Sequence, residues 1–200
     1  MNDIAGLPVP KGFASEAARQ VCSEYADEAL FHHSVRSYAF GAEYARVRGL
    51  SYDAELFYVS ALLHDLGLTA PFDSHTLPFE EAGGHVAKIL TAGLGWPADR
   101  RDRAAEIIVL HMRHDVTAEE DVESHLLQIG TTADVSGGGL DGFDPEFTAE
   151  LMRRHPRAGF GGAFLKLVTD QGRRKPGCAA DGLVRSGVAD RIAANPLERA

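Results

Sequence analysis

The chain has 200 residues, of which 44% are hydrophobic and 24% are charged, and its formal net charge is -9 at pH 7. This composition is that of one folded domain with a real core, and the acidic balance argues against a general binder of nucleic acid or acidic membranes. The two cysteines, Cys22 and Cys178, lie far apart without a CxxC pattern, so neither a disulfide framework nor a thiolate zinc site is expected.

The amino-terminal part predicts an extended arm and two helices. Residues 1–12 are broken by glycine and proline and lack the basic and apolar regions of a secretory signal. Ser15 is typical of an N-cap for a helix that runs to Tyr25, and a second helix over about 33–48 stops at Gly49. Because no apolar run reaches the ~20 residues that span a bilayer, a cytoplasmic protein without membrane contact is expected.

A third helix, from Ala54 to Asp65, is apolar on nearly all sides in its second half, which is typical of a buried central helix. Gly67 ends it, and a loop over 69–78 follows. Thr117 and Glu120 fit a capping box ahead of a later helix. Further helices are predicted at about 79–92, 98–114, 121–136, 145–154 and 158–172.

Alternating strand patterns are scarce, so the predicted fold class is all-α. The predicted domain is a single helical unit over 1–172 that includes the amino-terminal arm. The run Arg173–Gly177 breaks the helical pattern, and 173–200 is predicted to be a carboxy-terminal tail with one short helix.

A charged pair in an apolar setting is the most informative feature. His64 and Asp65 directly follow the segment Val59–Leu63, at the end of the helix expected to be most buried. An ionised carboxylate there costs several kcal/mol without a partner, and a divalent cation bound by imidazole and carboxylate is one such partner. Taken alone, the pair is better explained by capping, with His64 at the helix end and Asp65 in the following turn.

Two further residues strengthen the metal interpretation. His33 is expected to start a helix, and Asp134 lies in a neutral or apolar stretch beside Ile129 and Val135, where a carboxylate meets the same desolvation problem. Either residue alone could be structural. The order His, then His-Asp, then Asp on successive core helices is far more specific.

This order resembles the HD superfamily of metal-dependent hydrolases, named for the His-Asp pair that Leu62–Gly67 reproduces. The chain is most similar to the cyanamide hydratase-like branch, whose asparagine-histidine-serine-x-arginine signature is matched by His32–Arg36. The resemblance covers roughly Leu7 to Phe143. Other matching residues are Tyr38, Phe40, Gly41, Phe79, Glu80, Gly83, Leu110, His111, Asp134 and Val135.

The resemblance implies an HD-domain helical bundle holding one divalent metal ion. Zinc is expected, although the same ligand types also accept iron or manganese. A bound metal lowers the pKa of water to about 7, so hydroxide attack on a small nitrile such as cyanamide would give urea. The implied metal ligands are His33, His64, Asp65 and Asp134.

Roles for neighbouring residues follow from the same resemblance. Glu80 or His111 would carry a proton to the product nitrogen, and Arg36 would orient a ligand or hold an aspartate. The sequence departs from the branch at His32, where asparagine is usual, and at Met112, so the substrate is open. Substrate contacts are expected from His32, Phe72 and Phe79.

Other functions remain open at this point. An HD phosphohydrolase acting on a nucleotide or other phosphomonoester would need basic residues near the ligands, and few are present. A dinuclear iron oxygenase would require His85 or a substitute as a further ligand. A non-catalytic regulator fits poorly with an intact ligand set. A small-molecule substrate is expected for the enzymes, and a homodimer is compatible with the sequence.

Overall fold

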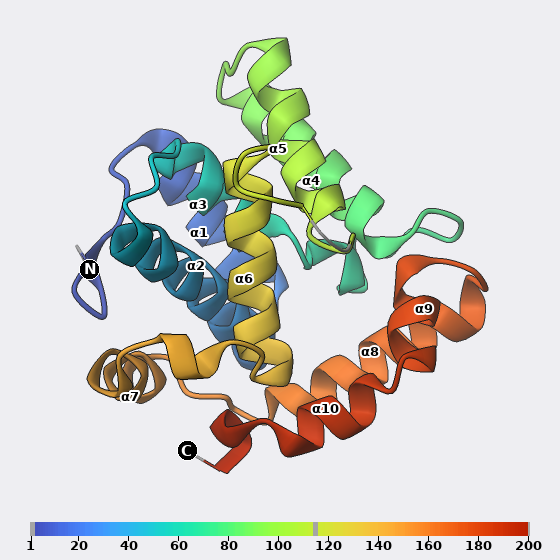
Figure 1. The fold of residues 1–200 in the computed structure, drawn as a ribbon. Helices are drawn as coiled ribbons and strands as arrows, with labels where there is room; N and C mark the ends of the chain where they lie inside the picture. Colours follow the sequence, from blue (N-terminus) through green and yellow to red (C-terminus); the bar gives the residue numbers. More distant parts are fainter. Residues whose placement is uncertain (1–2, 114–115, 200) are drawn as a thin grey trace.

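The computed structural model describes residues 3–113 and 116–199, and within them helices dominate (Figure 1). This confirms the all-α prediction. The exceptions are the antiparallel strands β1 (Asp3–Ile4) and β2 (Leu7–Pro8) in the amino-terminal arm. The α-helices are α1 (Phe13–Tyr25), α2 (Glu28–Arg48), α3 (Ala54–Leu63), α4 (Phe79–Gly93), α5 (Ala98–Leu110), α6 (Val122–Ser136), α7 (Pro145–Arg154), α8 (Phe160–Arg174), α9 (Ala179–Arg185) and α10 (Val188–Ala194), with short 3-10 turns η1 (Leu66–Leu68), η2 (Leu140–Gly142) and η3 (Pro196–Arg199).

Helices α2 and α6 form the centre of the molecule and lie side by side. Two glycines allow their backbones to approach closely. A Cβ atom on Gly130 would overlap the carbonyl group of Ser37, and one on Gly41 would lie 2.5 Å from the carbonyl oxygen of Leu126. The absence of a side chain at these positions therefore sets how near the two helices can lie.

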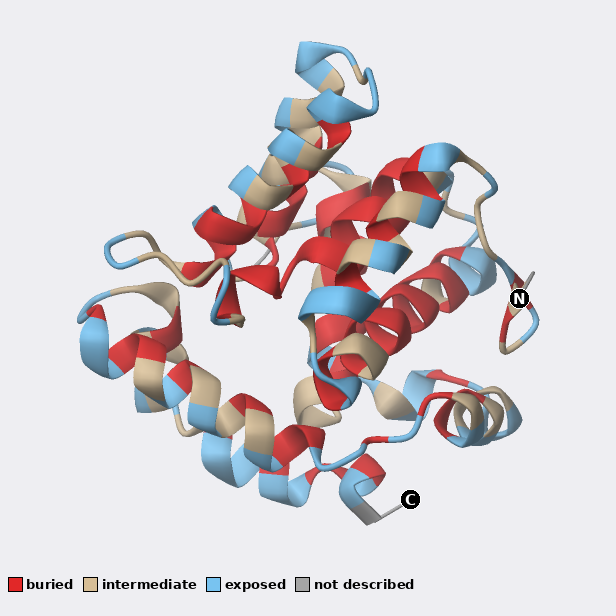
Figure 2. Ribbon diagram, turned by 180° about the vertical axis from the view of Figure 1, so that it is seen from behind, coloured by how far each residue is buried: buried red, intermediate tan, exposed pale blue. Residues whose placement is uncertain are grey.

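Helix α3 is buried as its apolar sequence predicts. Its second half, including Leu62 and Leu63, has no exposed side chain, and it packs against α1, α2 and α5. The Asp53 side chain caps its start by accepting a hydrogen bond from the backbone N–H of Leu56 at 3.0 Å. Figure 2 shows buried residues gathered in the central helices, with exposed residues at the far end of the α4–α5 pair.

Two predicted helix starts are wrong in position. Helix α1 begins at Phe13, and the Ser15 hydroxyl is buried without a hydrogen-bond partner in the described chain, so it caps nothing. Helix α2 begins at Glu28, because the Asp27 side chain accepts from the backbone N–H of Leu30 at 2.8 Å. His33 consequently lies inside the helix rather than at its start.

The connection between α5 and α6 also differs from the prediction. Helix α5 ends at Leu110, whereas the helix was predicted to run to residue 114, which lies outside the described residues. Thr117 and Glu120 make the reciprocal hydrogen bonds of a capping box, but the side chain that caps α6 is Asp121.

The carboxy-terminal segment 173–200 contains more structure than the predicted tail with one short helix. It includes the end of α8, the two helices α9 and α10, and the turn η3. Helix α9 packs on α8, and α10 packs on α6 and α8. The sequence did not predict both of these helices because each spans only about two turns and glycines interrupt the helical pattern between them. Across the described chain, no helix combines the length and apolarity needed to cross a membrane.

Candidate metal centre

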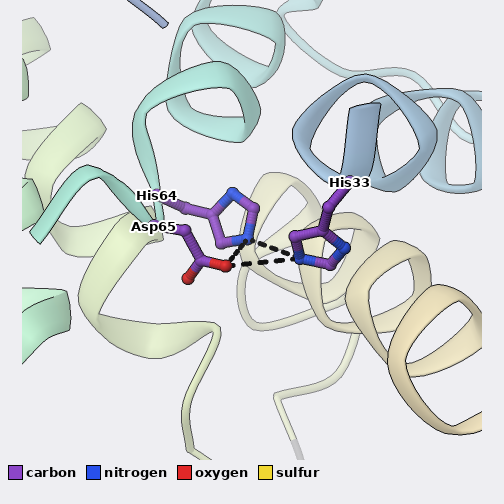
Figure 3. Close-up of side chains that lie close together, drawn as sticks. All are labelled: His33, His64 and Asp65. Carbon is purple, nitrogen blue, oxygen red and sulfur yellow. Dashed lines mark hydrogen bonds and ion pairs between the residues drawn. The ribbon is translucent and has the colours of Figure 1, made fainter. Parts of the chain in front are cut away.

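Three predicted ligands converge where the end of α3 meets α2. His33 projects from the second turn of α2, and His64 and Asp65 directly follow the last residue of α3. Figure 3 shows the two imidazoles and the carboxylate turned toward one another. All three residues are buried, with exposed fractions of 2% or less.

The converging atoms are the two Nε2 nitrogens and one carboxylate oxygen. His33 Nε2 lies 3.2 Å from His64 Nε2, and each of these atoms lies 3.4 Å from Asp65 Oδ2. Asp65 Oδ2 accepts no hydrogen bond from the residues that the structure describes. An uncompensated buried carboxylate oxygen is costly, so this atom requires a cationic partner.

Hydrogen bonds on the far side of each ring fix the tautomers. His64 Nδ1 lies 2.7 Å from the carbonyl oxygen of Ala61, which can only accept, so Nδ1 carries the proton. His33 Nδ1 similarly donates to Asp134 Oδ2 at 2.6 Å. In the neutral rings both Nε2 atoms therefore present lone pairs toward each other and toward Asp65, an arrangement that repels unless a cation lies between them.

The donor atoms fit a zinc-type ion. Ligand atoms held about 2.0–2.2 Å from a tetrahedral zinc ion lie about 3.3–3.6 Å from one another, close to the observed separations of 3.2 and 3.4 Å. In this described part of the chain, His33, His64 and Asp65 form a group able to hold a metal ion. Burial opposes the charged form of His33, yet the hydrogen bond to the Asp134 carboxylate and the nearby charge of Asp65 raise its pKa above the ordinary value.

Asp134 lies beside the site but outside this group. Its carboxylate contacts Nδ1 of His33, on the opposite side of the ring from Nε2. It also receives a two-pronged contact from Arg36, whose Nε lies 2.6 Å from Oδ1 and whose Nη2 lies 2.9 Å from Oδ2. The expected role of Asp134 as a fourth ligand stays a prediction, since in this structure its oxygens contact Arg36 and His33.

The two aspartates are both held ionised. Burial alone would raise the pKa of Asp134, but the Arg36 guanidinium and the His33 hydrogen bond lower it well below its usual range. The pKa of Asp65 is likewise lowered, since the adjacent histidines outweigh the effect of burial. Arg36 is fully buried, so its predicted role of holding an aspartate matches its contacts with Asp134.

His111 provides a third imidazole at the same place. Its Nδ1 donates to the carbonyl oxygen of Ile108, and its Nε2 faces Asp65 Oδ1 at 4.0 Å. Its ring lies edge-on to that of His64, with the centroids 4.9 Å apart. Burial and the neighbouring His64 lower the pKa of His111 to about 3, so the ring is neutral and its Nε2 carries no proton.

A cavity of about 1210 Å³ opens onto these residues. It reaches His33, His64, Asp65 and His111 at one place and extends along the outer face of α6 toward α9. Apolar side chains, among them Met112 and Phe164, share its wall with a few arginines. The ligand group is thus accessible to a small molecule although each ligand is buried.

The cavity wall, as far as it is described, does not include His32, Phe72 or Phe79. The His32 ring turns to the carbonyl oxygen of Pro156, 3.0 Å from its Nδ1, and Phe72 packs on Tyr25 with centroids 4.8 Å apart. Phe79 is buried behind His111. In this structure the three side chains lie away from the described wall, and their expected contacts with substrate stay a prediction.

Glu80 is buried near Asp65 and is not part of the described cavity wall. Its Oε2 has no hydrogen-bond partner in the part of the chain that the structure describes. Burial is the main cause that raises the pKa of this carboxyl group. His85, a possible second-metal ligand, is exposed on α4 and contributes nothing to the group.

Sequence reasoning missed two residues that support His33. Phe160 stacks on the His33 ring with centroids 4.2 Å apart and an interplanar angle of 12°. Arg157 Nη1 lies 3.1 Å from Asp134 Oδ1 and donates to the Asp134 carbonyl oxygen at 2.6 Å. The only local signal was a histidine-proline-arginine run between two helices, in which His155 is buried.

Comparison with known proteins agrees with this geometry. The HD domain family model matches residues 30–136, more than half of the 200-residue chain. The cyanamide hydratases DDI2 and DDI3 of Saccharomyces cerevisiae are each 26% identical to the chain over 176 residues, which is 86% of this chain and 78% of each relative. The match and the ligand group together show that the chain belongs to the HD domain family and is a metal-dependent enzyme of that superfamily.

Proposed function

We propose that this enzyme is a hydratase that adds water to a small nitrile such as cyanamide, giving urea. The observation that carries the proposal is the convergence of His33 Nε2, His64 Nε2 and Asp65 Oδ2 at the base of an open cavity. The similarity over most of the chain to two cyanamide hydratases supports the choice of substrate class.

One zinc ion held by His33, His64 and Asp65 is the proposed cofactor, with iron or manganese as the alternatives that the same ligand types allow. When bound, such an ion supplies the Lewis acidity that lowers the pKa of water to about 7. The protein supplies the orientation of the ligands. Asp134 and the Ala61 carbonyl fix the two imidazole rings so that their lone pairs face inward.

Hydration to urea moves both protons of water from oxygen to the nitrile nitrogen. As the oxygen–carbon bond forms, one π bond of the nitrile breaks and its electron pair takes up the first proton, and the second proton moves from oxygen to nitrogen when the resulting isourea tautomerises to urea. We assign the transfer of the first proton to His111, because its Nε2 faces the ligand group and the residue lines the cavity. Glu80, the other residue considered for this role, is the weaker choice because it lies outside the described wall.

A phosphomonoesterase is the second candidate function. Three arginines in the cavity wall favour it, since guanidinium groups bind phosphate oxygens well. None of the three is paired with the ligand group among the described contacts, so the hydratase remains the better match. The three residues are Arg48, Arg113 and Arg191.

Assaying urea from cyanamide and phosphate from a nucleotide panel separates the two functions. We expect urea formation by the zinc-loaded protein and its loss in Asp65→Asn. Asp102→Asn is the matched control, because Asp102 is an exposed partner of Lys88 and should leave the rate unchanged. Phosphate release without urea, abolished by the same Asp65→Asn change, would instead establish the phosphomonoesterase.

A further inference from the structure

The carboxy-terminal end of the chain reaches the residues behind the ligand group. Asn195, between α10 and η3, is 1% exposed, and its Nδ2 donates to the carbonyl oxygen of Asp134 at 2.8 Å. The same carbonyl oxygen accepts from Arg157 Nη1 at 2.6 Å. Two segments distant in sequence therefore hold the main chain at the end of α6 where Asp134 lies.

Glu198 completes this arrangement through Arg157. Its carboxylate forms an ion pair with Arg157 Nη2, while Arg157 Nη1 faces Asp134 Oδ1 at 3.1 Å. Arg36 and Arg157 thus place two guanidinium groups beside the buried Asp134 carboxylate, and the partly exposed Glu198 carboxylate pairs with the second of them. Without Glu198, Arg157 would lose one of its two carboxylate partners beside a site that must itself accept a cation.

Arg157 also contacts the other support of His33. Its guanidinium carbon lies 4.9 Å from the centroid of Phe160, the ring that stacks on His33. The next residue, Ala158, has a φ of 50°, a left-handed conformation that is unfavourable for alanine and persists where surrounding contacts impose it. The turn is thus held in the shape that delivers Arg157 and Phe160 to the site.

We propose that Arg157, Asn195 and Glu198, here called the carboxy-terminal clamp, are positioning residues for the metal centre. They act through Asp134, which holds the His33 ring by its Nδ1 proton. Outer partners of this kind usually contribute about 10- to 100-fold to metal affinity. The proposed role of the clamp depends on the metal centre of the proposed function, and it is independent of which substrate the enzyme uses.

The test compares zinc dissociation constants of full-length variants, measured by competition with a chromophoric chelator. Glu198→Gln preserves side-chain size and removes the carboxylate charge that pairs with Arg157, and we expect it to weaken zinc binding about tenfold. Glu150→Gln is the matched control, because Glu150 pairs with Arg153 and Arg154 on α7, away from the ligand group. It should stay within about twofold of the parent protein.

A double substitution shows whether the clamp acts through the aspartate. In an Asp134→Asn background, the further change Glu198→Gln should have no added effect on the zinc dissociation constant. The absorption spectrum of the cobalt-loaded protein should also change in Glu198→Gln and not in Glu150→Gln, because altered ligand placement changes cobalt coordination.

Asn195→Ala tests the same clamp where Glu198→Gln does not fold. It removes the hydrogen bond to the Asp134 carbonyl, and about tenfold weaker zinc binding is again expected. Clamp variants that bind zinc as tightly as the parent overturn the clamp and leave the metal centre intact. A parent protein that binds no divalent metal overturns the proposed function itself.

Discussion

At the residue scale, Asp65 and Asp134 are both buried carboxylates beside histidine, yet their contacts differ. Asp65 offers an unpartnered oxygen to the ligand group, whereas Asp134 is engaged by Arg36 and His33. We predict that Asp65→Asn loses zinc, while Asp134→Asn retains it with about 10- to 100-fold weaker affinity. Metal content after dialysis and a zinc titration measure the two effects.

Metal content also shows which outcome would contradict the different roles of Asp65 and Asp134. If Asp134→Asn purifies without metal under conditions in which Asp65→Asn also does, Asp134 is a direct ligand and the contact with His33 Nδ1 is not its role. Asp73→Asn provides a control, because Asp73 is a partly buried aspartate bound by Gln171 and Lys175 away from the ligand group. Its metal content should equal that of the parent.

The sequence predicted the ligand group because polar and charged side chains stand in a stretch that is otherwise apolar and expected to be buried. A histidine-aspartate pair after five apolar or small residues carries its own signal, and His33 is tied to it by the family motif. Nothing local shows on which side of the His33 ring Asp134 lies. Arg157 and Asn195 carry no such signal, since each sits in a polar turn, and only the tertiary fold brings them to Asp134.

At the element scale, the approach of α2 and α6 sets the distance between His33 and Asp134. We predict that Gly130→Ala destabilises the protein by about 3 kcal/mol, because the new Cβ atom would overlap the Ser37 carbonyl. For a chain of this size the thermal midpoint should fall by about 6–12 °C. Thermal unfolding of the metal-free protein measures the change without a contribution from zinc.

A second glycine provides the control for this substitution. Gly162 lies within α8 with open space around the position of a Cβ atom, so Gly162→Ala should be neutral or stabilise by about 0.5–1 kcal/mol through helix propensity. Equal midpoints for Gly130→Ala and Gly162→Ala would contradict close packing between α2 and α6.

The sequence predicted the positions of some helices more accurately than those of others. Helix α3 was easily predicted because it is apolar on all sides, and its predicted end at the His-Asp pair lies within two residues of its observed end at Leu63. The starts of α1 and α2 depend on which polar residue caps a helix, and Asp27 was not recognised as the cap of α2. Helices α9 and α10 gain their stability from packing on α8 and α6, which local sequence does not show.

At the scale of the whole molecule, zinc would join α2 to the end of α3 and so resist unfolding. Zinc at a hundred times its dissociation constant should stabilise the native state by about 2.7 kcal/mol, raising the thermal midpoint by about 5–10 °C. At a fixed zinc concentration this stabilisation should increase with pH. The raised pKa of His33 gives the metal-free protein stability that is present below the unfolded pKa and is lost as pH rises through the folded value.

The pH dependence follows from competition between a proton and zinc for His33 Nε2. Thermal midpoints measured with and without zinc should therefore differ more at pH 8 than at pH 6. His64→Ala should abolish the zinc-dependent shift at both values, whereas His85→Ala, at an exposed position on α4, should preserve it. A zinc shift that stays constant from pH 6 to pH 8 would contradict zinc binding through His33 Nε2, because that atom must lose its proton before it can bind the metal.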